Sequence, residues 1–235
     1  MITAKQPEDD RLFKIIIEQI KLPLLHIARQ TEAANYGSNV NYADINSVAE
    51  MSLKMIDSFL LTKGQNSQTS LELEPVSVSS VLNSAADNLY DLAKLYNCSV
   101  ELRIAGKYGP VMSEKHKLEA ALTMLGYSYI EANTANIVER KRGRILLTAY
   151  RSSKGLVAGV FSPEVSFTNE QFQKSLDSFG STRQAIPEVI QSTGAGIFIA
   201  NSLLNDLTTK LRVAHYKKLS GLAATLLPSQ QLQFI

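Results

Sequence analysis

The spacing of apolar residues in the N-terminal part of the chain constrains the fold most. Between Asp10 and about Ala34, apolar side chains recur every three or four residues, a pattern typical of one helix with a single buried stripe. A polar turn follows, and a second helix of the same kind is expected from Asn41 to about Thr62. Two antiparallel helices cannot bury both stripes against each other alone. A second copy of the chain would complete a four-helix bundle, so a homodimer is predicted.

A polar segment over residues 63–69 then marks the predicted boundary between two domains, 1–66 and 67–235. Beyond this boundary, segments with helical periodicity and segments with strand alternation follow one another without a regular βαβ repeat. This order favours an α+β sandwich, in which the helices are segregated from a mixed sheet. Strands are expected at 70–74, 99–104, 144–150, 156–161, 210–216 and 220–227. Helices are expected at 78–96, at 113–132 with Ser113 as N-cap, in a short segment after Thr168, and at 194–205.

Composition excludes several other classes of protein. Hydrophobic residues are 45% of the 235-residue chain and charged residues 20%, which is typical of a soluble globular protein. A net charge of +2 is too small to indicate nucleic acid as the main partner. Cys98 is the only cysteine, so neither an intrachain disulfide nor a cysteine metal cluster is available, and no metal site is expected. No apolar run spans a membrane, and the polar N-terminus is not a secretory signal, so a cytoplasmic location is expected.

One short motif in the first helix indicates a possible function. Residues 18–24 read EQIKLPL, which resembles the phosphoacceptor box of bacterial sensor histidine kinases, usually written H-E/Q-L-R-T-P-L. Glu18 stands where that family has its phosphorylated histidine, and a carboxylate cannot form a phosphohistidine. The resemblance implies that a response regulator receiver domain docks on this helix. The implied docking residues are Glu18, Gln19, Lys21, Leu22 and Pro23.

The remainder of the chain resembles the catalytic ATP-binding domain of the same kinases, a fold shared with gyrase and the heat-shock-90 chaperones. The magnesium-binding asparagine of that family falls at Ser128, and the lysine that commonly follows falls at Glu131. The aspartate that recognises adenine falls at Ser162, and its loop lacks the family's glycines. An amide oxygen, a carboxylate and backbone freedom are therefore lost at the positions that would hold ATP and magnesium.

The family's last motif, G-x-G-L-G-L, is better retained, because Gly194 and Gly196 precede an apolar helix. Such glycines let backbone amides approach an anion, although a tight loop entering a buried helix is the favoured interpretation. The residues that build the fold remain, whereas the residues expected to bind ATP and magnesium have changed. This pattern is expected when a protein keeps its fold and loses its activity. Asn133 or Asn136 would approach the site if the alignment shifted by one helical turn.

The sequence therefore predicts a degenerate, non-catalytic histidine kinase core with no cofactor. Its expected partners are a second copy of itself and either a response regulator receiver domain or another histidine kinase. An alternative is a divergent kinase or phosphotransferase that uses His26 as phosphoacceptor together with ATP and magnesium. A third interpretation is a dimerisation module that senses another ligand in the vacated nucleotide pocket, lined by Tyr127, Tyr129 and Phe161.

Overall fold

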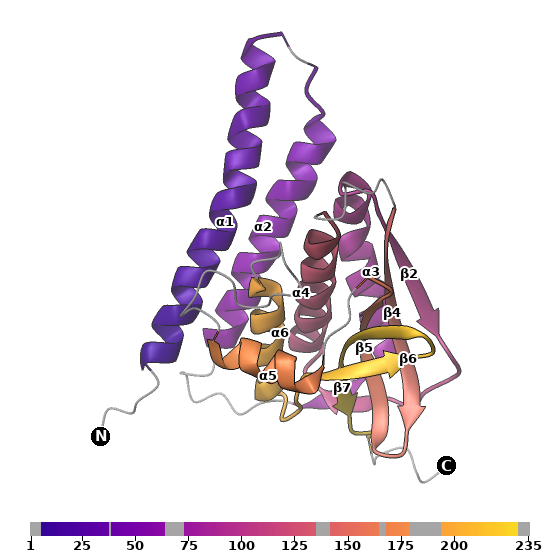
Figure 1. Cartoon of the computed structure of the whole chain (residues 1–235). Helices are drawn as coiled ribbons and strands as arrows, with labels where there is room; N and C mark the ends of the chain where they lie inside the picture. Colours follow the sequence, from indigo (N-terminus) through magenta and orange to yellow (C-terminus); the bar gives the residue numbers. More distant parts are fainter. Residues whose placement is uncertain are drawn as a thin grey trace.

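The computed structural model describes residues 6–37, 39–63, 73–134, 142–164, 168–178 and 194–229 (Figure 1). Its helices are α1 (Gln6–Asn35), α2 (Tyr42–Lys63), α3 (Val78–Leu95), α4 (Lys115–Thr134), α5 (Asn169–Ser178) and α6 (Ala195–Asp206). Its strands are β1 (Glu74–Val76), β2 (Cys98–Ile104), β3 (Val111–Ser113), β4 (Gly143–Ser152), β5 (Gly155–Ser162), β6 (Arg212–Tyr216) and β7 (Leu219–Leu226).

The chain opens with the expected hairpin of long helices, α1 and α2. Helix α1 continues through Pro23 as a single element. At the start of α2, the side chain of Asn41 accepts a hydrogen bond from the Ala43 amide at 3.1 Å and donates one to Asp44 at 2.9 Å. The first of these bonds satisfies a backbone donor of the first helical turn. The closed end of the hairpin projects beyond the rest of the molecule in Figure 1.

The larger sheet has the strand order β2-β4-β5-β7-β6. Strands β2 and β4 are parallel, whereas the other neighbours in this sheet are antiparallel. A separate two-stranded sheet joins β1 to β3. The fold is thus α+β with a mixed sheet, as the sequence predicted.

The layers follow from which side of each element is apolar. Helices α3 and α4 pack on one face of the large sheet, α6 packs on α4, and α2 packs on all three of these helices. The main core fills the space between them, and a smaller apolar cluster lies on the opposite face of the sheet. Helix α1 is outermost and packs against α2, with a minor contact to α6.

The hairpin is therefore joined to the body of its own chain. The inward side of α2 is buried and mostly apolar, and a polar chain reinforces this contact. Lys54 of α2 donates to the Asn88 side chain of α3 at 2.9 Å, and Asn88 donates to Glu119 of α4 at 3.1 Å. Intrachain packing thus covers one side of the hairpin.

Two local predictions were wrong. Ser113 does not cap α4, because it is the last residue of β3 and its buried hydroxyl has no hydrogen-bond partner among the described residues. Strand β1 begins at Glu74, and the described residue before it, Leu73, is not in a strand. The predicted boundary after residue 66 falls outside the described residues, so the division into two domains stays a prediction.

Candidate functional site

The position predicted for the magnesium-binding asparagine is closed by a helix–helix contact. Ser128 on α4 is fully buried, and its hydroxyl has no partner among the described residues. Gly196 of α6 lies directly opposite. A Cβ at residue 196 would sit well inside van der Waals contact with the Met124 carbonyl oxygen and with Ser128 Oγ. The two helices therefore meet at the position that the sequence predicts for the magnesium ligand.

The two retained glycines each have a structural reason. Gly194 is the N-cap of α6 and has φ +71°, in the left-handed region that side chains disfavour. Its carbonyl oxygen accepts the first helical hydrogen bond, from the Phe198 amide at 3.0 Å. Gly196 permits the close approach of α6 to α4. Both residues are buried, so each glycine has a structural role at the start of a buried helix.

The position predicted for the adenine-binding aspartate is occupied by a local turn. Ser162 is the last residue of β5 and is fully buried. Its hydroxyl donates to the Glu164 carboxylate at 2.5 Å and accepts from the Glu164 amide at 3.2 Å. Ser162 is thus engaged with its own loop and does not project into a cleft. The last position of this motif, Ser166, lies outside the described residues.

Asn133, further along α4, does not replace the missing ligand. The Asn133 side chain is buried and donates to the Tyr129 carbonyl oxygen at 2.9 Å. It also approaches Cys98 Sγ at 3.9 Å. Asn136 lies outside the described residues. The described part of the chain also brings together no three His, Cys, Asp or Glu side chains that could share a metal ion.

The predicted docking segment lies in the middle of α1. The backbone of residues 18–23 is helical, and among their described side chains Lys21 is exposed and Pro23 is half-buried. The side chains of Glu18, Gln19 and Leu22 lie outside the described set. His26 is half-buried one turn further on, and its Nε2 is buried with no hydrogen-bond partner among the described residues. As positioned here, that nitrogen does not face solvent.

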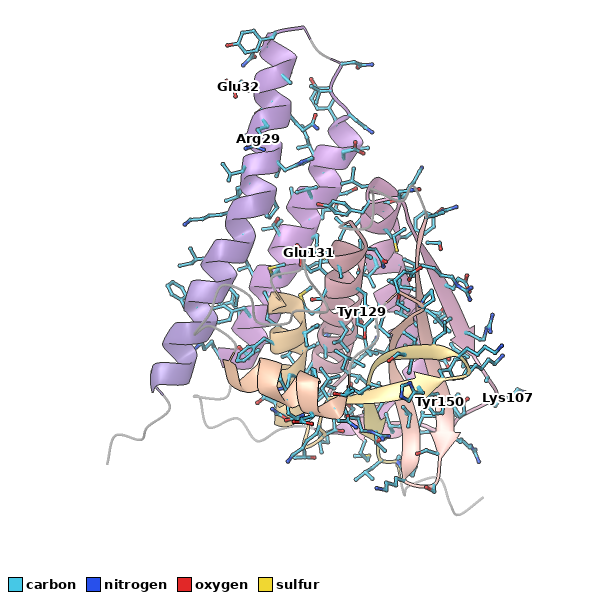
Figure 2. All side chains as sticks on the ribbon, in the orientation of Figure 1. Arg29, Glu32, Lys107, Tyr129, Glu131 and Tyr150 are labelled. Carbon is cyan, nitrogen blue, oxygen red and sulfur yellow. The ribbon has the colours of Figure 1, made fainter. Side chains whose placement is uncertain are left out.

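The aromatic pocket predicted for a substitute ligand does not form. Phe161 faces the opposite side of the sheet, where its ring lies 6.3 Å from that of Tyr150 and 6.0 Å from that of Tyr216. Tyr129 points from α4 onto the helix-covered face, and Figure 2 shows Tyr129 and Tyr150 in separate regions of the molecule. Tyr127 borders a third location, between α4 and the hairpin. The three rings therefore cannot line one pocket.

Burial also suppresses the acidity of Tyr129. Its side chain is fully enclosed, which raises the pKa of the phenol, and the nearby Leu222 backbone offsets part of that effect. The hydroxyl nevertheless lacks the geometry of a hydrogen bond with any described residue. Tyr129 acts as a packing residue between α4 and the sheet.

The sequence did not predict a cavity of about 360 Å³ that lies between the hairpin and the rest of the chain. Helices α1 and α2 form one side of it, and the C-terminal ends of α3 and α4 form the other. His26 and Arg29 line it from α1, and Tyr96 and Glu131 line it from α3 and α4. We call this space the interhelical cavity.

Comparison with known proteins identifies the fold. No protein-family model matches the chain, and no curated protein sequence matches it. Solved structures do match. The histidine kinase AdeS of Acinetobacter baumannii is 13% identical, with a TM-score of 0.52 over 88% of this chain and 96% of that one. Histidine kinase ThkA, solved in complex with the response regulator protein TrrA, is 11% identical with a TM-score of 0.54.

The ThkA match covers 94% of this chain and 65% of ThkA. Full-length ShkA in complex with AMPPNP is 13% identical with a TM-score of 0.54, over 94% of this chain and 46% of ShkA. These matches include both the hairpin and the sheet with its helices. None of the described helices combines the length and the apolar run that a bilayer crossing requires. Despite its low sequence identity to these proteins, the chain has the fold of a histidine kinase core.

Proposed function

We propose that this chain is a non-catalytic, histidine kinase-like protein of two-component signalling. It acts as a dimeric docking or regulatory module for a response regulator receiver domain or for another histidine kinase. The hairpin supplies the dimer contact and the docking surface, and the sandwich that follows it supports the hairpin. Glu18 provides a fixed negative charge in place of a transferable phosphoryl group.

The burial of the nucleotide-site positions carries this proposal. Ser128, Ser162, Gly194 and Gly196 are all buried. Ser128 faces a helix, and Ser162 is engaged by Glu164. ATP would need a separation of α6 from α4 and new ligands for magnesium. Retention of the fold without this chemistry supports a role that depends on protein contacts.

Exposed apolar side chains on the hairpin support the dimer. Phe13, Ile17 and Leu24 of α1 are 53%, 41% and 55% exposed, and they lie within about 40° of one another around the helix. Leu53 and Leu60 of α2 are 60% and 56% exposed on the side that faces away from the body of the chain. We call these five residues the hairpin stripe. A second hairpin would cover this surface and complete a four-helix bundle.

The first test is a calorimetric titration of the purified protein with ATP and magnesium. We expect no saturable heat up to millimolar nucleotide. Micromolar binding would contradict the proposal, because it would require the α4–α6 contact to open. A histidine kinase of known nucleotide affinity, titrated in the same buffer, provides the positive control.

The second test measures binding of receiver domains from the same genome to immobilised protein. We expect at least one to bind, and we expect Lys21→Glu to weaken it because it reverses an exposed charge in the docking segment. Lys107→Glu, an exposed charge far from the hairpin (Figure 2), is the matched control. If the two substitutions weaken receiver binding equally, the proposed docking surface is wrong.

The alternative function uses His26 as the phosphoacceptor. One observation favours it, since His26 Nε2 has no partner among the described residues and is thus not held by a structural hydrogen bond. Incubation with labelled ATP and magnesium, followed by treatment with acid, distinguishes the two. Acid-labile label that His26→Ala removes would establish the alternative.

A further inference from the structure

We propose that the interhelical cavity binds a small organic acid with an apolar, preferably aromatic, body. This inference does not rest on the proposed function, because it concerns a separate site and a separate readout. The cavity volume of about 360 Å³ falls at the lower end of the range of ligand pockets, roughly 300–1,000 Å³. A small molecule is therefore the class of ligand that fits.

The floor of the cavity suits an apolar body. Met51 and Met55 of α2 are 3% and 1% exposed, and Leu92 of α3 is also buried. Methionine side chains adapt to irregular shapes, and their sulfur atoms make favourable contacts with aromatic rings. Tyr127 adds a ring from α4. These residue types favour an aromatic group over a sugar or a purely polar ligand.

The α1 side of the cavity suits an anion. Arg29 is exposed at the edge of the cavity, and none of the ion pairs found between described residues involves it. His26 lies three residues earlier, and its buried Nε2 has no partner among the described residues. A buried polar atom without a partner carries a free-energy cost that a hydrogen bond would remove. A carboxylate beside Arg29 would accept from the guanidinium, and rotation of the His26 ring would let it accept from Nε2 as well.

The opposite side of the cavity fixes the orientation of the ligand. Glu131 lines it from α4, and Figure 2 shows Arg29 and Glu131 on different helices. Burial raises the pKa of the neighbouring Tyr96, and the Glu131 carboxylate raises it further. A negative charge is unfavourable near this side, whereas a hydrogen-bond donor is favourable. The ligand should therefore carry its carboxylate toward α1 and any N–H or O–H group toward Glu131.

Indole-3-acetate is a suitable probe because it has a carboxylate, an aromatic body and a ring N–H. The chain has no tryptophan, so indole fluorescence can be excited beyond the absorption of tyrosine and reports only on the probe. We expect its fluorescence anisotropy to rise to saturation as protein is added. We expect the uncharged analogue indole-3-ethanol to bind about tenfold more weakly, because it loses the charge-assisted hydrogen bonds.

Variants locate the site. Arg29→Ala should weaken indole-3-acetate binding by about tenfold or more. Arg103→Ala, an exposed arginine on β2, should leave it unchanged. His26→Ala, on the same helix face as Arg29, should weaken binding by a smaller factor. Circular dichroism confirms that each variant is folded.

Three results would overturn the inference. One is the absence of saturable binding up to millimolar probe. Another is equal affinity of the wild type and Arg29→Ala, which would place the probe elsewhere, for example on the hairpin stripe. The third is equal affinity for the acid and the alcohol, which would show that no anion site is present.

Discussion

Replacement of Gly196 by alanine tests whether the nucleotide position is closed. The added Cβ would meet the Met124 carbonyl oxygen and Ser128 Oγ, both on the buried face of α4. Overpacking of a core costs about 1–3 kcal/mol, and these obstacles are a backbone atom and a short side chain, which favours the upper value. Alanine also gains about 1 kcal/mol of helix propensity over glycine. The net expected loss is about 2 kcal/mol.

For a chain of this size, that loss corresponds to a fall in Tm of about 4–8 °C, which differential scanning fluorimetry or calorimetry can measure. Gly109→Ala is the matched control, because its Cβ would have no neighbour within 4 Å. We expect a change within about 0.5 kcal/mol there. Wild-type stability of Gly196→Ala would refute the reasoning, since an open cleft at residue 196 would accept a methyl group without strain.

The same contact can be tested from the side of α4. Ser128→Ala removes a buried hydroxyl that has no partner among the described residues, so it should be neutral or slightly stabilising. In combination with Gly196→Ala it should recover part of the loss, because one of the two obstacles is gone. The double-mutant cycle should therefore be non-additive, as expected for residues in contact. Strict additivity would mean that the two side chains do not meet.

Three further predictions concern the hairpin and the thiol. Glu18→His should not create an autokinase, because the nucleotide positions stay buried, and acid-labile label from ATP would contradict this. Leu24→Glu combined with Leu53→Glu should shift the protein from dimer to monomer in sedimentation velocity, whereas Tyr90→Glu, exposed on α3, should not. Burial, with a smaller contribution from a nearby carboxylate, raises the pKa of Cys98 to about 11. Iodoacetamide at pH 8 should therefore alkylate native protein about a hundredfold more slowly than unfolded protein.

The order of helices and strands was predictable because burial imposes a period. In α3, the spacing of Leu82, Ala85, Leu89 and Leu92 predicts the buried face that the structure contains. Strands β4 and β5 were expected from two apolar runs joined by a short polar turn, and they pair as a hairpin across Ser152 and Gly155. By contrast, β1 and β3 have three residues each, too few for any period to be visible.

The lining of the candidate site was less predictable, because it depends on which face of an element meets which neighbour. The run from Leu156 to Phe161 is apolar on both sides, since the sheet is covered on both faces. Because side chains alternate between the two faces of a strand, Val160 and Phe161 lie on opposite faces of the sheet. The sequence does not indicate which of the two faces the helices. Tyr127 and Tyr129 are likewise two positions apart on a helix that is buried on most sides, and they face different neighbours.

The interhelical cavity could not be predicted from any local pattern. Helix α1 packs on α2, and the side of α1 that carries His26 faces α3 and α4. The side chains there do not fill the space between these helices, which leaves the cavity. The volume between helices depends on their crossing geometry and on the side chains at the contact. The one signal in the sequence was His26, a lone histidine on the first helix.

The cavity and the predicted docking segment share α1, and this gives a prediction about their coupling. Among the described elements, α1 packs mainly on α2, so an acid held between Arg29 and the ends of α3 and α4 would add a contact between α1 and the body of the chain. If receiver binding favours one position of α1, the acid must change receiver affinity, and the receiver must change acid affinity by the same factor. Titration of each ligand at saturating levels of the other measures both factors. If the two changes in affinity differ in size, thermodynamic linkage does not hold and one of the binding measurements is an artefact. If neither ligand changes the affinity for the other, the docking segment does not move when the cavity is filled.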